Sequence, residues 1–317
     1  MTLTKPAHTD HQHKNDSVAP ASPRVSTPLS SWWSRRAPII MVAPMVILAS
    51  IFILIPAVLT LIGSFFQIPF TGGEWKFVGF DNFNRVFTTS QITKSMLNTV
   101  IYSVLTIIPS LAIGLLLALG AESVTRGKAL LRTLLFLPMT ANLVAMAVVF
   151  AYIFDYRIGI LNAFLGAMGV APVNWLGDTS TSLLTVAVVG IWRTSSFTMM
   201  IFFAGLATIP ATMNEAARMD GIRGWTKLFR ITIPAMKPSV VFATVMAVLQ
   251  SVQAFDTVRV MTDGGPKYSS EVIQTMTWRM GFQYFDLGTA SALSFIMIAV
   301  LIAVGLWQRR VLGGREK

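Results

Sequence analysis

The chain has 317 residues, of which 54% are hydrophobic and 12% charged, and its mean hydropathy is +0.64. Soluble domains carry about 25% charged residues, so this composition indicates an integral membrane protein. The formal net charge is +11, but the basic residues are dispersed among long apolar runs, which favours membrane orientation over nucleic-acid binding. Cysteine is absent, which excludes disulfides, thiol nucleophiles and Cys-ligated metals.

Residues 1–37 are rich in Ser, Thr, Pro, Lys and His, so we expect a disordered cytoplasmic tail. The three histidines of the chain, His8, His11 and His13, all lie in this tail. A solvated tail is the simpler interpretation, and metal binding is the alternative. The first apolar run begins late and is too long for a signal-peptide core, so it is expected to be an uncleaved anchor.

Six apolar segments are long enough to cross hydrocarbon about 30 Å thick. Because backbone groups in lipid must bond one another, we expect an all-α fold, a six-helix transmembrane bundle over residues 38–310. Prolines within these segments are expected to kink or terminate helices. The expected spans are residues 38–66, 96–121, 130–154, 182–207, 239–261 and 288–308.

The orientation follows from the basic residues. Most Lys and Arg residues lie in alternate segments, which the positive-inside rule places in the cytoplasm. Both termini, including the C-terminal tail 311–317, are therefore expected inside. The basic segments are 1–37, 122–133, 208–239 and 308–317, and the segments expected outside are 67–95, 155–181 and 261–287.

The inner connection 208–238 is a long polar interruption between two apolar segments. Residues 213–220 favour a short helix, and Gly221 is suited to end it in the left-handed conformation. A second short turn or helix is expected over residues 224–230, with Pro234 and the later Pro238 stopping it before the next span. Such a helix-turn-helix would act as a rigid lever. The alternative is an ordinary basic loop that merely satisfies the positive-inside preference.

The segment Glu215-Ala216-Ala217-Arg218-Met219-Asp220-Gly221, followed by Ile231-Thr232-Ile233-Pro234, resembles the cytoplasmic coupling loop of permease subunits in binding-protein-dependent ABC importers. The resemblance implies a type I permease fold and a loop held in a groove of an ATP-binding subunit. The residues to which it assigns ATPase coupling are Glu215, Ala216, Ala217, Asp220, Gly221, Ile231 and Pro234.

Three further segments resemble the carbohydrate-uptake branch, of the maltose/glycerol-3-phosphate permease type. They are Phe77-Val78-Gly79-Phe80-Asp81-Asn82-Phe83, Thr262-Asp263-Gly264-Gly265-Pro266 and Gly288-Thr289-Ala290-Ser291-Ala292. Gly264, Gly265 and Pro266 are candidates for contact with the binding protein. Their alternative role is a tight outer turn, and both roles can hold.

The resemblance also implies the partners and the location. The expected partners are a second, different permease chain, two ATP-binding subunits, an extracytoplasmic solute-binding protein and the lipid bilayer, with no nucleic acid. ATP and Mg²⁺ would be bound by the ATPase subunits, and no cofactor by this chain. The expected location is a bacterial plasma (inner) membrane. We expect no enzymatic activity, since the chain has no phosphate-binding loop and no hydrolase motif.

Polar residues at membrane depth are candidates for the substrate pathway, because they are costly there unless they face a cavity or a partner. Amides and an aromatic ring suit a sugar, and Arg193 is a weaker candidate. The alternative role is hydrogen bonding between helices. The candidates are Asn142, Ser195, Gln250, Gln253, Phe255 and Asp256.

The expected substrate is a disaccharide or an oligosaccharide, and the alternative is glycerol-3-phosphate or a related polyol phosphate. Two other functions remain open. An ion-coupled secondary transporter would carry ionisable groups near the bilayer midplane, where Asp256 is the nearest example. A membrane anchor for a soluble complex would explain the inner loop but not the polar residues at membrane depth.

Overall fold

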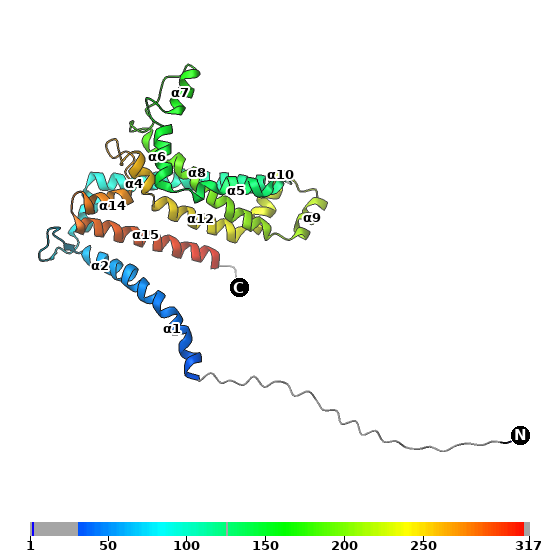
Figure 1. The fold of residues 1–317 in the computed structure, drawn as a ribbon, viewed down its shortest axis with the longest axis horizontal. Helices are drawn as coiled ribbons and strands as arrows, with labels where there is room; N and C mark the ends of the chain where they lie inside the picture. The colour runs from blue at the N-terminus through cyan, green and yellow to red at the C-terminus, as the bar shows by residue number, and fades with distance from the viewer. Residues whose placement is uncertain (1, 3–30, 125, 314–317) are drawn as a thin grey trace. The chain divides into compact units, whose positions relative to one another are not determined.

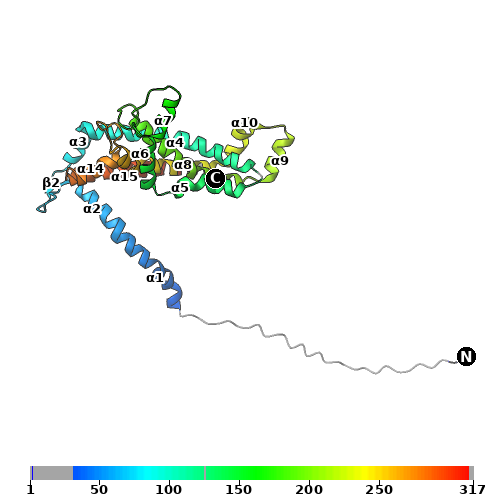
Figure 2. The same ribbon diagram turned by 45° about the horizontal axis from the view of Figure 1, so that its top comes forward.

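The computed structural model describes Thr2, residues 31–124 and residues 126–313. The histidines of the predicted N-terminal tail lie outside these residues. The chain divides into two units, Met1–Ile55 and Pro56–Lys317, which are described separately. Figures 1 and 2 show the chain from two directions.

The first unit contains α1, Ser31–Ala49, and a π-helical turn η1, Ser50–Leu54. The helix begins at Ser31, so residues 31–37 are helical, contrary to the expected tail. A helix that is already nucleated gains one hydrogen bond for each added residue, which favours this extension. No residue from Arg36 to Ile55 is buried. The apolar helical run Arg36–Gly63 is long enough to cross a membrane.

The second unit is built almost entirely of helices. Its elements are α2 (Ile55–Gly63), β1 (Phe66–Gln67), β2 (Lys76–Phe77), α3 (Asp81–Thr88), α4 (Ser90–Ser123), α5 (Lys128–Thr140), α6 (Leu143–Ile153), α7 (Ile160–Ala167), α8 (Ser182–Ala207), α9 (Ala211–Met219), α10 (Gly224–Lys227), η2 (Leu228–Thr232), α11 (Ile233–Ala235), α12 (Lys237–Val252), α13 (Asp256–Met261), α14 (Ile273–Phe282) and α15 (Leu287–Gly313). The strands β1 and β2 form an antiparallel hairpin that pairs Phe66 with Phe77.

Helices α4 and α8 form the centre of the bundle and pack together along their lengths. Small polar residues allow this close approach, as is common between membrane helices. The Thr198 hydroxyl donates to the carbonyl of Ser110 at 2.9 Å. Helix α12 packs against both. In Figure 1, α9 and α10 lie at one end of this bundle, and α14 lies at the other.

Three buried clusters hold the bundle. The first joins α4, α6, α8 and α13, the second α3, α4, α14 and α15, and the third α4, α8 and α12. The end near α14 is also tied by Asn82, which is 3% exposed. Its amide donates to the carbonyls of Ser64 at 2.9 Å and Phe66 at 3.0 Å, which fixes the hairpin against α3.

The third expected span, residues 130–154, is not one straight helix. Helices α5 and α6 meet at an angle of 94°. Pro138 lies in the last turn of α5, where it removes a helix hydrogen bond. Asn142 then caps α6, its side-chain oxygen accepting from the N–H of Ala145 at 3.1 Å. Five helices are long and apolar enough to cross a membrane, and α5 with α6 would make a sixth span among the described residues.

Candidate functional site

The loop between α8 and α12 begins with α9, whose C-terminus is closed by Gly221. This glycine has φ +70°, a left-handed conformation that costs it no side-chain strain. Its N–H donates to the carbonyl of Arg218 at 3.1 Å, and the N–H of Ile222 donates to the carbonyl of Ala217 at 2.9 Å. This bond pair is a Schellman motif, which satisfies carbonyls at a helix end. The helix and its stop therefore lie where the residue types predict them.

The two sides of α9 differ in exposure. Ala217 is 2% exposed, so this side chain packs inward. Glu215, Ala216 and Asp220 are exposed, and Met219 is 89% exposed. Helix α9 thus presents two carboxylates and a large apolar side chain on its accessible surface. Such a combination is available for contact with another protein.

The second half of the loop carries an exposed aromatic pair. Trp225 and Phe229 are 68% and 62% exposed, and their rings stack with centroids 6.0 Å apart. They belong to α10 and η2, which continue directly into α11. Ile231, on the same run, is half-buried. The accessible apolar surface of the loop therefore extends beyond the predicted coupling residues.

The second short helix of the loop ends between Pro234 and Pro238, before the next span, as the residue types predict. Pro234 lies in the first turn of α11 and Pro238 in the first turn of α12. In the first turn of a helix the N–H has no partner within the helix, so proline is tolerated at Pro238, whereas Pro234 continues the helical run that begins at Gly224. The turn that separates the two helices is at Met236. The helical part of the loop is thus separated from α12 by this one turn.

A polar pocket of about 170 Å³ lies between α4, α8 and the junction of α12 with α13. It brings together four of the six candidate pathway residues, Gln250, Gln253, Phe255 and Asp256. The remaining lining residues are Tyr102, Leu143, Gly190, Arg193, Thr194, Ala254 and Thr257. Most of the side chains that line the pocket carry a group able to form hydrogen bonds, so the pocket suits a polar solute.

The pocket exists because the fifth span is interrupted. Helix α12 ends at Val252 and α13 begins at Asp256, and the three intervening residues are not helical. Gln253 forms the C-terminal cap of α12. Irregular backbone at membrane depth is tolerated only where protein or a water-filled cavity surrounds it. The interruption is therefore consistent with a hydrated pocket.

Gly190 lets α8 approach the ring of Tyr102 on α4. A Cβ atom at position 190 would collide with the hydroxyl oxygen of Tyr102 and lie 3.0 Å from Cγ2 of Thr106. Only glycine leaves room for this ring, which is 3% exposed. The tyrosine thereby forms one wall of the pocket.

The charged groups of the pocket are Arg193 and Asp256. The Nε atom of Arg193 is buried and has no hydrogen-bond partner among the described residues. No ion pair within 4.0 Å joins the two side chains. A solute in this pocket would thus meet an unneutralised guanidinium group and a carboxylate.

The other two candidates do not line the pocket. The exposed Asn142 has its side-chain oxygen engaged in capping α6. Ser195 is 3% exposed, and its hydroxyl has no partner in the described chain. The neighbouring Ser196 donates to the carbonyl of Leu135, which joins α8 to α5. Asn142 thus caps a helix, and Ser195 is buried within the bundle.

Residues that the sequence did not single out complete the pocket. Tyr102, Gly190, Thr194 and Thr257 come from three helices that are distant in the sequence. Tyr102 carries a hydroxyl group within an apolar run. A polar group at membrane depth was the reason for selecting Gln250, so the same reasoning could have found Tyr102. Threonine and glycine are common inside membrane helices, so the sequence offered no comparable signal for them.

The outer-loop candidates form a closely held turn. Gly264 is buried against the side chain of Glu271, while Gly265 and Pro266 are partly exposed. Glu271 is completely buried, and one of its oxygens lies 3.1 Å from a guanidinium nitrogen of Arg279. Of the three candidates, only Gly265 and Pro266 present surface to a partner.

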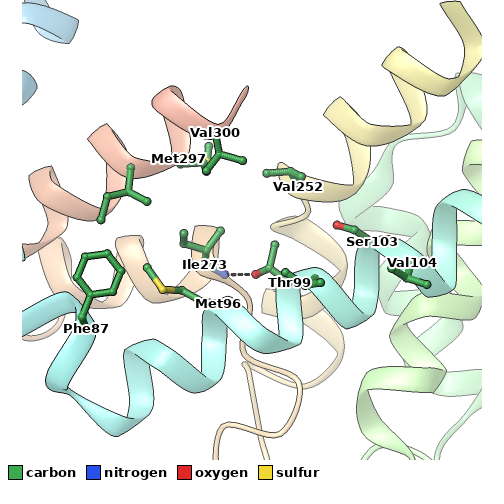
Figure 3. Close-up of a pocket in the computed structure, with 11 residues that line it drawn as sticks. Phe87, Met96, Thr99, Ser103, Val104, Val252, Ile273, Met297 and Val300 are labelled. Atoms are coloured by element: carbon green, nitrogen blue, oxygen red, sulfur yellow. Dashed lines mark hydrogen bonds between the residues drawn. The ribbon is translucent and has the colours of Figure 1, made fainter. Parts of the chain in front are cut away.

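A larger pocket, of about 350 Å³, is apolar in character (Figure 3). It lies between α4, α14 and α15, with Val252 at the end of α12. Its Thr99 hydroxyl is engaged, since it accepts from the N–H of Ile273 at 2.8 Å. Little remains here to bind a polar solute.

Two connecting loops carry acidic turns outside the spans. The Asp155 carboxylate accepts from the N–H groups of Arg157 at 2.8 Å and Ile158 at 2.9 Å. The hydrogen bond from the N–H of Ile158, followed by that from the N–H of Arg157, lowers the pKa of this carboxyl below its usual value. Asp178 accepts from the N–H and hydroxyl of Ser180, which likewise lowers its pKa. No group of three His, Asp or Glu side chains in the described chain could hold a metal ion.

Residues 95–315 match a family described as "Binding-protein-dependent transport system inner membrane component". The chain belongs to this family. It is accordingly a non-catalytic, multi-pass permease subunit of an ABC transporter of the inner membrane, as the coupling-loop resemblance led us to expect.

Individual relatives cover nearly the whole chain. The sulfoquinovosyl glycerol transport system permease protein SmoG of Agrobacterium fabrum is 31% identical over 89% of this chain and 92% of its own length. The sn-glycerol-3-phosphate transport system permease protein UgpA of the same organism is 32% identical over 86% and 93%. The trehalose/maltose transport system permease protein MalF of Thermococcus litoralis is 28% identical over 85% and 94%.

The fold is also shared with solved structures. A chain of a bacterial ABC transporter involved in the import of the acidic polysaccharide alginate superimposes with a TM-score of 0.79, covering 90% of this chain and 98% of that one at 22% identity. A chain of a bacterial alginate ABC transporter in complex with an alginate pentasaccharide-bound periplasmic protein gives a TM-score of 0.77, with 90% of this chain and 96% of that one covered at 21% identity. The expected all-α type I permease fold is thereby confirmed.

Proposed function

We propose that this chain forms half of the translocation pathway of an ATP-driven importer for a sugar, with a disaccharide or an oligosaccharide as its substrate. The observation that carries the proposal is the polar pocket beside the interrupted fifth span. Its amides and aromatic rings suit the hydroxyl edges and apolar faces of sugars. The trehalose/maltose permease among the relatives supports the same substrate class.

In this proposal both termini and the loop 208–238 lie in the cytoplasm. The loop docks on an ATP-binding subunit, and ATP and Mg²⁺ are held by two such subunits. A second permease chain forms the other half of the pathway, and a solute-binding protein delivers substrate from outside. ATP must stabilise one arrangement of the loops over the other, because a ligand shifts a conformational equilibrium only through differential affinity.

The second candidate substrate is glycerol-3-phosphate or a related polyol phosphate. It is favoured by Arg193, whose Nε has no partner in the described part of the pocket, and by the UgpA relatives. Asp256 in the same pocket opposes an anionic substrate through like-charge repulsion. We therefore place the neutral sugar first. The family match gives no support to an ion-coupled carrier.

The proposal is tested by reversing the charge at Glu215 in the complete transporter, reconstituted in proteoliposomes with its binding protein. Glu215→Arg places a like charge near Arg218 and is expected to abolish both uptake and binding-protein-stimulated ATPase activity. The matched control is Glu74→Arg, a charge reversal at an exposed position of the hairpin region. It is expected to leave both activities near wild type.

Two results would contradict the proposal. One is Glu215→Arg uptake equal to that of wild type. The other is uptake that proceeds without ATP and follows an imposed proton or sodium gradient. The substrate class is tested separately by offering labelled maltose and labelled sn-glycerol-3-phosphate to the wild-type complex. Uptake of the phosphate alone would favour the second candidate.

A further inference from the structure

A second pocket, of about 340 Å³, adjoins the polar pocket and shares Phe255 with it. It lies between α14 and α15, with Thr60 of α2 at its edge. No charged side chain is among the described residues that line it. Its principal lining residues combine aromatic rings with amide or hydroxyl groups, and they are Phe255, Gln274, Trp278, Phe282, Ser291 and Ser294.

The ring of Trp278 is held in place before any ligand binds. Trp278 and Phe282 lie one helical turn apart on α14, with ring centroids 5.9 Å apart. The guanidinium carbon of Arg259 lies 4.1 Å from the centroid of the Trp278 ring. Arg259 is in turn paired with Asp263. The tryptophan is therefore fixed by a cation–π contact that is itself fixed by an ion pair.

The polar groups of this pocket lack internal partners or keep acceptor capacity. In the described chain, neither the side-chain amide of Gln274 nor the hydroxyl of Ser291 has a hydrogen-bond partner. The Ser294 hydroxyl donates to the carbonyl of Ala290 at 2.9 Å, which leaves its oxygen able to accept. A lipid chain or an apolar helix seated here would leave the Gln274 amide unpaired, and an unpaired polar group costs free energy in an apolar environment.

We infer that this pocket binds one pyranose ring of the transported substrate, as a second subsite joined to the polar pocket through Phe255. The inference rests on the proposed import function and names where a second glycosyl unit lies. A pyranose matches the site because its faces are apolar and its rim bears hydroxyl groups. A volume of about 340 Å³ is also within the range of about 300–1,000 Å³ found for ligand pockets.

The test is saturation-transfer NMR of the complete transporter in nanodiscs, with maltose as the probe and glycerol as the ring-free control. The first variant is Gln274→Leu, which removes the amide but keeps a side chain suited to the membrane. A sugar site predicts that the maltose signal falls by roughly fivefold, since a lost hydrogen bond costs about 1 kcal/mol. An apolar occupant predicts no loss in this variant. Trp278→Ala is expected to lower the maltose signal similarly.

Two controls keep the result interpretable. Trp278→Phe retains an aromatic face and is expected to keep most of the signal. Trp307→Ala removes an exposed tryptophan of α15 outside the pocket and is expected to change nothing. Assembly of each variant is checked by gel filtration.

The inference is overturned if Gln274→Leu and Trp278→Ala both bind maltose like wild type. A disulfide formed under an added oxidant between Ser291→Cys and a cysteine introduced in a helix of the second permease would also overturn it, because the pocket would then be a subunit interface. If wild type shows no maltose signal but imports another substrate with ATP, the subsite is wrong and the import function stands. If import itself needs no ATP, the import function fails.

Discussion

Replacing Gly190 by alanine tests whether the close approach of α8 to Tyr102 shapes the polar pocket. The added Cβ would collide with the Tyr102 hydroxyl and lie 3.2 Å from Cζ of the same ring. Carbon contacts are optimal at about 3.5–4.0 Å, so the ring must move into the pocket. Overpacking of this kind costs about 1–3 kcal/mol. Alanine recovers up to about 1 kcal/mol through its higher helix propensity.

The matched control is Gly120→Ala, on the neighbouring helix α4. A Cβ there meets no atom within 4 Å, so only the helix propensity changes. The difference in stability between the two variants therefore isolates the overpacking, and we expect it to be about 1–3 kcal/mol. It is measured as the loss of monodisperse transporter after heating in detergent, and uptake by proteoliposomes is measured in parallel. Gly190→Ala should lower uptake, while Gly120→Ala should not.

The double variant Gly190→Ala with Tyr102→Phe decides the cause. Removing the hydroxyl removes the worst collision, so the second substitution should restore stability lost through the first. Neighbouring residues typically show coupling of about 0.5–3 kcal/mol in such cycles. Strictly additive effects of the two substitutions, or a Gly190→Ala variant as stable and active as Gly120→Ala, would refute the reasoning.

Three other outcomes are expected. Gly221→Ala forces a left-handed residue with a side chain at the end of α9, at a cost of about 1–2 kcal/mol, and should weaken cross-linking of the loop to the ATPase subunit; unchanged cross-linking would contradict this. Arg279→Ala leaves the buried Glu271 carboxylate uncompensated and should cost about 3–5 kcal/mol of stability. The control Arg85→Ala breaks an exposed ion pair worth about 0–1 kcal/mol, so equal heat stability of the two variants would refute a structural role for the Arg279–Glu271 pair. Asn142→Ala should cost about 1 kcal/mol through the lost cap and leave uptake unchanged, so a selective loss of uptake would restore Asn142 as a pathway residue.

The positions of the long helices were predictable because they depend on local composition. Helix α8, Ser182–Ala207, has the bounds of the apolar run expected there. The break between α5 and α6 was less predictable. Pro138 marks a possible bend, but its angle depends on how the two helices pack and on the cap that Asn142 supplies. Composition alone does not carry that information.

The candidate pocket was predictable only on one of its sides. Gln250 and Gln253 are polar residues within an apolar run, and that cost points to a cavity or a partner. Tyr102 and Gly190 lie opposite them because α4 and α8 pack closely, and the sequence does not specify that pairing. The same limit applies to Ser195, which is polar at membrane depth but is buried elsewhere in the bundle.

The two helix breaks have a joint consequence for hydration. Leu143, the first residue of α6, lines the same cavity as the residues between α12 and α13. Residues beside both breaks thus line one cavity, and irregular backbone at membrane depth is tolerated only where protein or water surrounds it. We therefore expect this cavity to hold water when no solute is bound.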